Sequence, residues 1–181
     1  MKLGKTLDVA NRDEWREWLA RNHDREAEIW LVYYRKSSGK PRISYDEAVE
    51  EALCFGWIDS TVKNVGEDSF AQRFTPRAPG RPLSEMNKER VRRLLAAGKM
   101  TPAGMAVAGD IESRLEIAPD ILAELRKDER TWANFEEFPE FYKIIRVAFI
   151  EGARNRPEEF RRRLNHFLKM TAEGKMFGMV K

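Results

Sequence analysis

The chain has 181 residues, of which 42% are hydrophobic, 10% aromatic and 35% charged, and its formal net charge is +3. This length suits one domain, or one domain with a helical appendage, and the apolar content excludes a disordered chain. No apolar run approaches the roughly 18 residues of a membrane span, and the first residues lack the apolar stretch of a signal peptide. We therefore expect a cytoplasmic protein.

Positive charge is concentrated in one part of the sequence. Residues 71–102 carry 8 basic and 2 acidic side chains, an excess of +6, whereas residues 1–70 carry 11 basic and 14 acidic ones, which sum to −3. An anionic partner would be attracted to the central segment, so nucleic-acid binding through residues 73–99 is one hypothesis. The alternative is that these charges form ordinary solvated helix surface.

The first part of the chain is predicted to form a helix, a strand and a second helix. Asn11 can cap a helix over residues 12–21, in which apolar side chains recur at helical spacing. Residues 28–36 are rich in aromatic and β-branched side chains on both alternating faces, which is typical of a strand covered on both sides. Ser44 then opens a capping box, and Gly56 ends the helix that follows.

A β-hairpin is predicted next, from residues 57–63 and 69–75. The segment between them has the Gly, Asn and Asp content of a hairpin connection. If the turn is centred on Gly66, apolar side chains pair on one face and Asp59 lies directly opposite Arg73 on the other.

The rest of the chain is predicted to be helical. Helices are expected over residues 84–97, from 101, over 113–127, from 139 and from 157, on the evidence of caps, prolines at helix starts and apolar stripes. In the helix from 139, the stripe expected to pack inward contains Phe141, Ile144, Ile145, Ala148 and Phe149. We therefore predict an α+β fold. A core domain over residues 1–110 holds a small antiparallel sheet of about three strands with helices, and an all-helical C-terminal region over residues 111–181 packs on it.

The usual signatures of metal, nucleotide and nucleophilic chemistry do not occur. One cysteine and two separated histidines supply no zinc ligand set, and the sequence holds no P-loop, GxGxxG or GxSxG motif. We expect no metal and no cofactor. Cys54 lies between apolar residues and is interpreted as a core side chain, His23 as part of a helix end, and His166 as a surface or boundary residue.

One polar constellation carries a functional hypothesis. Residues 57–61, residues 72–77, Ser84 and Asn87 would bring together an indole, an acid, two guanidinium groups and a helix start. Arginine forks and helix N-termini both bind carboxylate or phosphate, so a small anion is the expected ligand. The alternative is that Asp59 and Arg73 only tie the hairpin together and that Ser84 only caps a helix.

The sequence also resembles a known family. The strings from Ile43 to Ser60, from Gln72 to Arg77 and from Asn87 to Arg90 resemble the YdeI/OmpD-associated family, whose members are described as bacteriocin-protection or porin-associated proteins. A stretch starting at Trp132 resembles its C-terminal helical region, so the resemblance covers roughly residues 5–177. Leu83 departs from the family pattern, which often has Trp there. The resemblance implies these ligand-binding residues: Trp57, Asp59, Ser60, Gln72, Arg73, Thr75, Arg77, Ser84 and Asn87.

Three functions follow as hypotheses. The resemblance and the polar constellation favour a non-enzymatic protein of stress or bacteriocin resistance that binds a small anionic ligand or a partner protein. The first alternative is an enzyme that acts on a small anionic substrate with Asp59 as acid or base. The second is the nucleic-acid binding described above, although no RNA- or DNA-binding motif occurs. The sequence predicts no reaction, and no catalytic residue is assigned.

Overall fold

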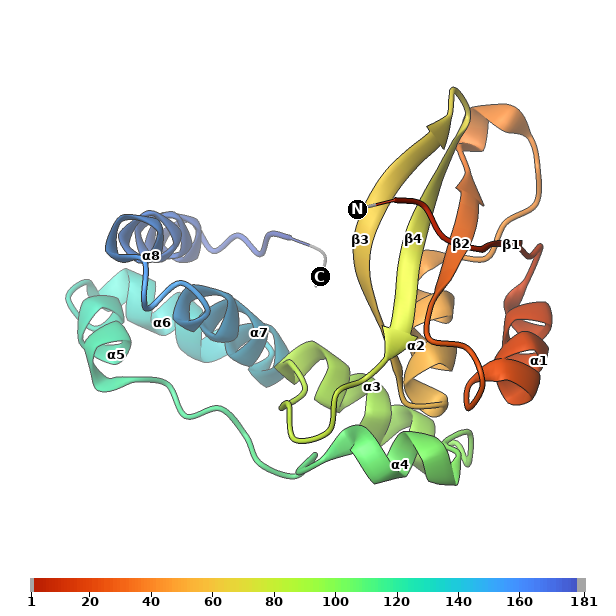
Figure 1. Cartoon of the computed structure of the whole chain (residues 1–181). Coiled ribbons are helices and arrows are strands. Elements are labelled where there is room, and N and C mark those ends of the chain that lie inside the picture. Colours follow the sequence, from red (N-terminus) through yellow and green to blue (C-terminus); the bar gives the residue numbers. More distant parts are fainter. Residues whose placement is uncertain (1, 179–181) are drawn as a thin grey trace. The chain divides into compact units, whose positions relative to one another are not determined.

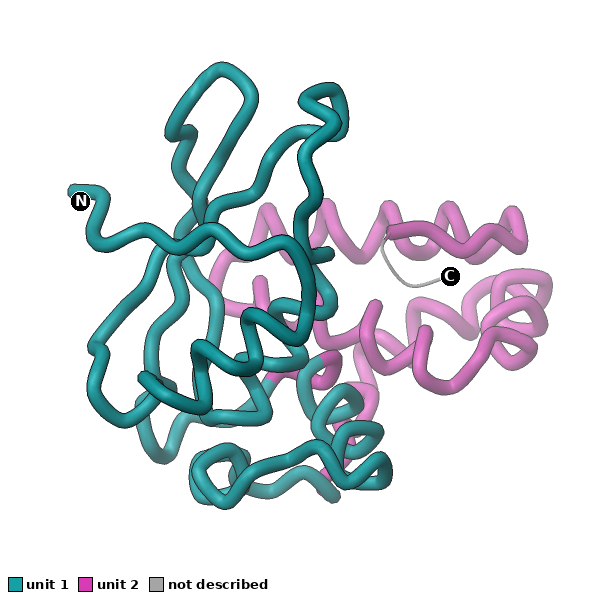
Figure 2. Tube along the Cα trace, turned by 90° about the vertical axis from the view of Figure 1, so that its right-hand side faces the viewer, with its two compact units in different colours: residues 1–83, 87–112 teal, residues 84–86, 113–181 magenta. Residues whose placement is uncertain are grey.

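The computed structural model describes residues 2–178, which form two compact units (Figure 2). The first unit contains residues 1–83 and 87–112, and the second contains residues 84–86 and 113–181. None of the helices in the described range combines the length and the apolar character that crossing a bilayer requires.

The first unit is built on a four-stranded sheet in the order β1-β2-β4-β3 (Figure 1). The strands are β1 (Thr6–Asp8), β2 (Ile29–Tyr34), β3 (Trp57–Gly66) and β4 (Ser69–Pro76). β1 pairs in parallel with β2, and the other pairs are antiparallel. The predicted α+β class is confirmed, but the sheet is mixed and has one strand more than expected, because β1 is too short to show a strand pattern.

Two helices pack against one face of this sheet. They are α1 (Arg12–Asn22) and α2 (Tyr45–Cys54), with the short 3₁₀ turn η1 (Lys36–Ser38) before α2 (Figure 1). Asn11 accepts the predicted cap bond from the Glu14 amide, and Ser44 forms the predicted capping box. The hydrophobic core lies between these helices and the sheet, and contains Trp15, Ile29 and Phe74.

Two further helices follow the hairpin, α3 (Glu85–Ala96) and α4 (Pro102–Ala108). The start of α4 is fixed to the end of α2, because the Thr101 hydroxyl donates to the Cys54 carbonyl at 2.6 Å. Gly104 lies so close to the same carbonyl that a Cβ atom there would overlap the Cys54 oxygen. Cys54 itself is fully buried, as its interpretation as a core residue requires.

The second unit is helical, with α5 (Pro119–Leu125), α6 (Glu129–Glu137), α7 (Glu140–Glu151) and α8 (Pro157–Ala172). The helix predicted over residues 113–127 is wrong in extent, because Pro119 can start a helix but cannot continue one. The expected inward stripe of α7 is wrong in part as well. Phe149 is 49% exposed, whereas Tyr142 and Ile150 are buried.

The hairpin register also differs from the predicted one. Asp59 faces Phe74 rather than Arg73, and Ile58 faces Thr75. Because side chains alternate between the two faces of a strand, a shift of one residue moves a side chain to the other face of the sheet. The predicted Asp59–Arg73 pair is therefore wrong.

The position of the turn explains this difference. Gly66 pairs with Ser69, so the turn is formed by Glu67 and Asp68 instead of being centred on Gly66. The register also shifts twice within β3, between residues 59 and 62 and between residues 64 and 66. Each shift inserts one extra residue in β3. The predicted register paired residues symmetrically about one turn centre and therefore left out these inserted residues.

Candidate functional site

The predicted site residues divide between the two faces of the sheet. Asp59 and Gln72 lie on the face that α1 and α2 cover, whereas Arg73 lies on the other face. There, Arg73 forms an ion pair with Glu28 at 2.6 Å, and the Trp30 indole donates to the same carboxylate at 3.2 Å. The structure therefore does not bring Asp59 and Arg73 together on one face.

Trp57 belongs to the core and forms no wall of a site. Its side chain is 1% exposed, and its ring meets the Trp18 ring edge-on with the centroids 5.8 Å apart. The indole nitrogen donates to the His23 carbonyl at 3.0 Å. Trp57 thus satisfies a carbonyl at the end of α1, and its indole is enclosed by the core.

The remaining predicted residues have separate local contacts. The Ser60 hydroxyl donates to the Arg73 carbonyl at 3.3 Å, and Arg77 donates to the Arg81 carbonyl at 2.6 Å. Burial lowers the pKa of Arg77. Thr75 lies on the Arg73 side of β4. Ser84 precedes α3 and belongs to the second unit.

A compact polar cluster forms around Asp59 instead. We call Tyr33, Tyr45, Asp59 and Gln72 the Asp59 cluster. Gln72 donates to Asp59 Oδ2 at 2.6 Å, and the Tyr45 hydroxyl donates to the same oxygen at 3.0 Å. Both hydrogen bonds therefore go to one oxygen of the carboxylate, Asp59 Oδ2.

The strands place this cluster by simple alternation. Phe70, Gln72 and Phe74 point to one side of β4, so Gln72 is a polar residue between two apolar ones and is only 5% exposed. Tyr33 on β2 lies opposite Phe70, and the two rings stack with centroids 5.2 Å apart. This pairing makes Tyr33 a diagonal neighbour of Gln72. Tyr45 arrives from the first turn of α2.

The Tyr33 hydroxyl is the most unusual atom of the cluster. Tyr33 is 2% exposed, and its hydroxyl oxygen is buried without a hydrogen-bond partner in the described part of the chain. Burial raises the pKa of Tyr33, and the charges of Asp59 and Tyr45 raise it further, while Arg42 opposes them. The phenol therefore stays protonated and can donate a hydrogen bond at neutral pH.

Charged residues of both signs influence the cluster. Arg90, only 7% exposed, donates to Asp46 at 2.5 Å and to Asn87 at 2.9 Å. Burial and Asp59 raise the pKa of Tyr45 to about 12, and the Arg90 charge opposes this shift. Asn87 is thus the third predicted residue in this region, after Asp59 and Gln72.

Two protein-family models match the chain. Residues 7–107, more than half of the chain and all of the Asp59 cluster, match the model of a family described as a domain of unknown function (DUF8412). The chain belongs to the DUF8412 family. Residues 114–174 match a second model, described as "Bacteriocin-protection, YdeI or OmpD-Associated", which confirms the predicted resemblance for the C-terminal helices. No curated protein and no solved structure matches the chain.

In this DUF8412 protein, sequence reasoning missed three members of the site region. Tyr33, Tyr45 and Arg90 were assigned only to a strand and to helix surfaces. The signal that could have found Tyr45 is its position directly after Ser44 of the capping box, which places it at the start of a helix. In the described residues, no group of three or more His, Cys, Asp or Glu side chains could hold a metal ion.

Proposed function

We propose that this DUF8412 protein is a non-enzymatic binding protein whose first unit holds a small polar ligand at the Asp59 cluster. We further propose that this binding serves the bacteriocin protection named by the family that residues 114–174 match. The unpaired Tyr33 hydroxyl carries the proposal. Burying an unsatisfied polar group costs about 1–3 kcal/mol, and a ligand that bonds to it removes that cost.

The chemistry of the cluster defines the ligand. Asp59 Oδ1 offers an acceptor, so the ligand must supply a hydroxyl or ammonium donor. The Tyr33 hydroxyl offers a donor, so the ligand must also supply an acceptor. Asp59 and Asp46 are balanced by Arg42 and Arg90, which favours a neutral or zwitterionic molecule.

The prediction of an anionic ligand therefore needs a change: the ligand must also carry a hydrogen-bond donor for Asp59. A purely anionic molecule would meet the Asp59 carboxylate without Arg73 to offset the repulsion, because Arg73 is bound to Glu28. An anionic group fits only on a ligand that also donates to Asp59. Arg42 and Arg90 are then the nearby counter-charges, as their influence on the pKa values of Tyr33 and Tyr45 indicates.

A thermal-unfolding screen of the full chain tests this function. The compounds are free amino acids, sugars and sugar phosphates, each against wild type, Asp59→Asn and Asp24→Asn. Asp24 is an exposed acid beyond the end of α1 and serves as the matched control. A ligand at 100 times its Kd stabilises the folded state by about 2.7 kcal/mol.

We expect at least one compound to raise the melting temperature of wild type and Asp24→Asn but not of Asp59→Asn. If no compound does so, or if Asp59→Asn responds equally, the proposal is wrong. Tyr33→Phe and Tyr34→Phe form a second matched pair, because Tyr34 is the next residue on the opposite face and bonds to Asp8. Ligand affinity should fall only in Tyr33→Phe.

The link to bacteriocin protection needs a cellular measurement. Bacteria that produce wild type, Asp59→Asn or Asp24→Asn at equal levels are exposed to a pore-forming bacteriocin, and survival is counted. Wild type and Asp24→Asn should protect, and Asp59→Asn should not. Equal survival of bacteria with all three proteins would show that protection does not depend on Asp59, and it would contradict the proposed link between ligand binding and bacteriocin protection.

The other hypotheses from the sequence stay predictions. Catalysis by Asp59 would appear as chemical turnover of a ligand found in the screen. Nucleic-acid binding through residues 73–99 would show a steep dependence on salt. Against the latter, Arg73, Arg90, Arg92 and Arg93 each form an ion pair with a carboxylate, which reduces the free positive charge of this segment.

A further inference from the structure

The second unit contains a cavity that no sequence motif indicated. It has a volume of about 260 Å³ and is bordered by α7, α8 and the segment that follows α8. Its lining combines cations with aromatic and aliphatic side chains: Arg146, Phe149, Ile150, Arg162, Arg163, His166, Phe167 and Phe177. Among the residues that the structure describes, no carboxylate lines the cavity, which makes this lining cationic and largely apolar.

Arg146 is the arginine of this lining that has no counter-charge among residues 2–178. In the described residues it forms no hydrogen bond or ion pair, and its Nε atom is buried without an acceptor. Aromatic rings surround the guanidinium instead, with Phe177 at 5.1 Å and Tyr142 and Phe149 at 5.8 Å each. Burial lowers the pKa of Arg146. A desolvated guanidinium of this kind is suited to a bound anion.

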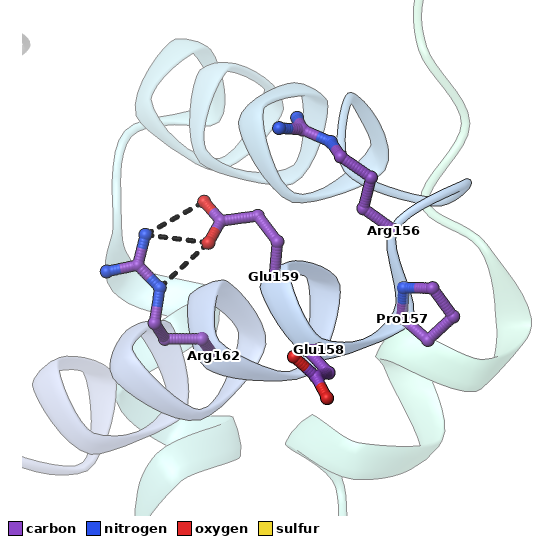
Figure 3. Close-up of a pocket in the computed structure, with 5 residues that line it drawn as sticks. All are labelled: Arg156, Pro157, Glu158, Glu159 and Arg162. Atoms are coloured by element: carbon purple, nitrogen blue, oxygen red, sulfur yellow. Dashed lines mark hydrogen bonds and ion pairs between the residues drawn. The ribbon is translucent and has the colours of Figure 1, made fainter.

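The other two arginines of the cavity are already engaged. Arg162 donates to both oxygens of Glu159, at 2.8 and 2.9 Å, as Figure 3 shows. Arg163 donates to Glu159 at 2.6 Å and to the Phe149 carbonyl at 2.6 Å. One carboxylate therefore holds both guanidinium groups, and Arg146 is left as the group that a ligand charge would meet.

The wide depression beside it does not offer an alternative site. It has a volume of about 740 Å³ and is lined by Arg156, Pro157, Glu158, Glu159 and Arg162 at the start of α8 (Figure 3). Two carboxylates occupy the first turn of this helix, where they already neutralise the positive end of the helix dipole. An anion would be repelled there.

The walls of the cavity favour a flat ring. The Phe177 and His166 rings meet edge-on with centroids 4.5 Å apart, and Phe149 is 49% exposed although it is a large apolar side chain. Phe177 is held in place because its amide donates to the Tyr142 hydroxyl at 3.2 Å. An aromatic ligand would cover Phe149 and pack against these rings, with a gain beyond the buried area.

We infer that this cavity is a binding site for a small aromatic monocarboxylate, whose ring packs on Phe149 and Phe177 and whose carboxylate pairs with Arg146. The volume agrees with this class, since a dry apolar cavity of roughly 150 Å³ binds benzene. The extra space accommodates a second fused ring together with a carboxylate. The volume lies below the usual range of about 300–1,000 Å³ for larger ligands, which disfavours nucleotides.

Isothermal titration of the full chain with 2-naphthoate tests the inference. 2-Naphthylmethanol supplies the same ring without a charge, and acetate and inorganic phosphate supply a charge without a ring. We expect 2-naphthoate to bind at least tenfold more tightly than each of these three. Failure of 2-naphthoate to bind, or equal binding of phosphate, would overturn the proposal, and both comparisons use only the wild-type protein.

Variants then locate the site. Arg146→Gln should weaken 2-naphthoate binding at least tenfold, and Phe177→Leu should weaken it severalfold. Arg161→Gln is the matched control, because Arg161 is exposed on α8 and does not line the cavity. Unchanged affinity in Arg146→Gln contradicts the assignment. Asp59→Asn should bind 2-naphthoate as wild type does, so this test is independent of the function proposed for the first unit.

Discussion

Asp59 and Arg73 occupy neighbouring strands but lie on opposite faces of one sheet. Asp59 accepts hydrogen bonds from Gln72 and Tyr45 on the face that the helices cover, and Arg73 binds Glu28 on the other. The two charges therefore belong to separate environments. The function that we propose for the first unit therefore rests on the phenols around Asp59 and not on an arginine across the hairpin.

This arrangement predicts that substitutions of Asp59 and Arg73 act independently. In urea unfolding, the effects of Asp59→Asn and Arg73→Gln on the free energy of unfolding should add within about 0.5 kcal/mol, as they do for sites without shared partners. Glu28→Gln with Arg73→Gln should show coupling, because these side chains are in direct contact at 2.6 Å. Coupling between Asp59 and Arg73 would contradict the observed register.

Glu51 is predicted to be the most important charged residue of the first unit. It is 1% exposed and forms ion pairs with Arg12 and, at 2.5 Å, with Arg16. Glu51→Ala should lower the free energy of unfolding by about 3 kcal/mol, because it leaves the partly buried Arg16 without its counter-charge and Arg12 with Glu50 alone. Glu17→Ala is the matched control.

Glu17 also forms an ion pair with an arginine, but the pair is exposed and lies within α1. Its loss should cost less than about 0.5 kcal/mol. Similar losses in the two variants would mean that Glu51 is accessible to water, contrary to its burial.

The second unit is predicted to lose stability in acid. Hydrogen bonds from Thr131 lower the pKa of Asp128 below its ordinary 3.8, and hydrogen bonds from Arg163 lower that of Glu159 below its ordinary 4.5. A depressed pKa in the folded state contributes stability above the ordinary value, and this contribution is lost as the pH falls through the folded value.

The melting temperature of this unit should therefore change little through these groups between pH 7 and about pH 5 and should fall below about pH 4.5. Thermal unfolding at a series of pH values measures this. Asp128→Asn should flatten the acid slope, and an unchanged slope in that variant would exclude the cap as its source.

Gly104→Ala tests the close approach of α4 to the end of α2. The added methyl group would overlap the Cys54 carbonyl oxygen, which is backbone and cannot move aside cheaply. We expect a loss of about 1–3 kcal/mol in the free energy of unfolding, typical of overpacking. Gly152→Ala is the control, since a methyl group there would meet its nearest neighbour at 3.4 Å and should be tolerated.

Local features of this chain could be predicted from the sequence. The caps at Asn11, Ser44 and Thr101 lie where expected, because a cap depends on residues only three positions apart. The α+β class and the helical C-terminal part follow from the same local periodicity. The strand β1 could not be predicted, since three residues show no alternation.

The sites could not be predicted because they depend on long-range geometry. The face of Asp59 was decided by where the turn falls and by two irregularities in β3, and neither leaves a clear pattern in the sequence. The cavity in the second unit needs Arg146 and Phe177, which are 31 positions apart and meet only after α7 and α8 have packed. Phe149 was wrongly assigned inward because adjacent helical positions differ little in hydrophobic pattern.

The thiol of Cys54 can report local opening of the first unit. It is the single thiol of the chain, it is fully buried, and the residues that cover it include those at the start of α4. A maleimide reagent can reach this sulfur only in molecules whose first unit has transiently opened. The labelling rate in native buffer thus measures the local opening of that unit. The second unit contains no cysteine, so its opening does not contribute to the labelling.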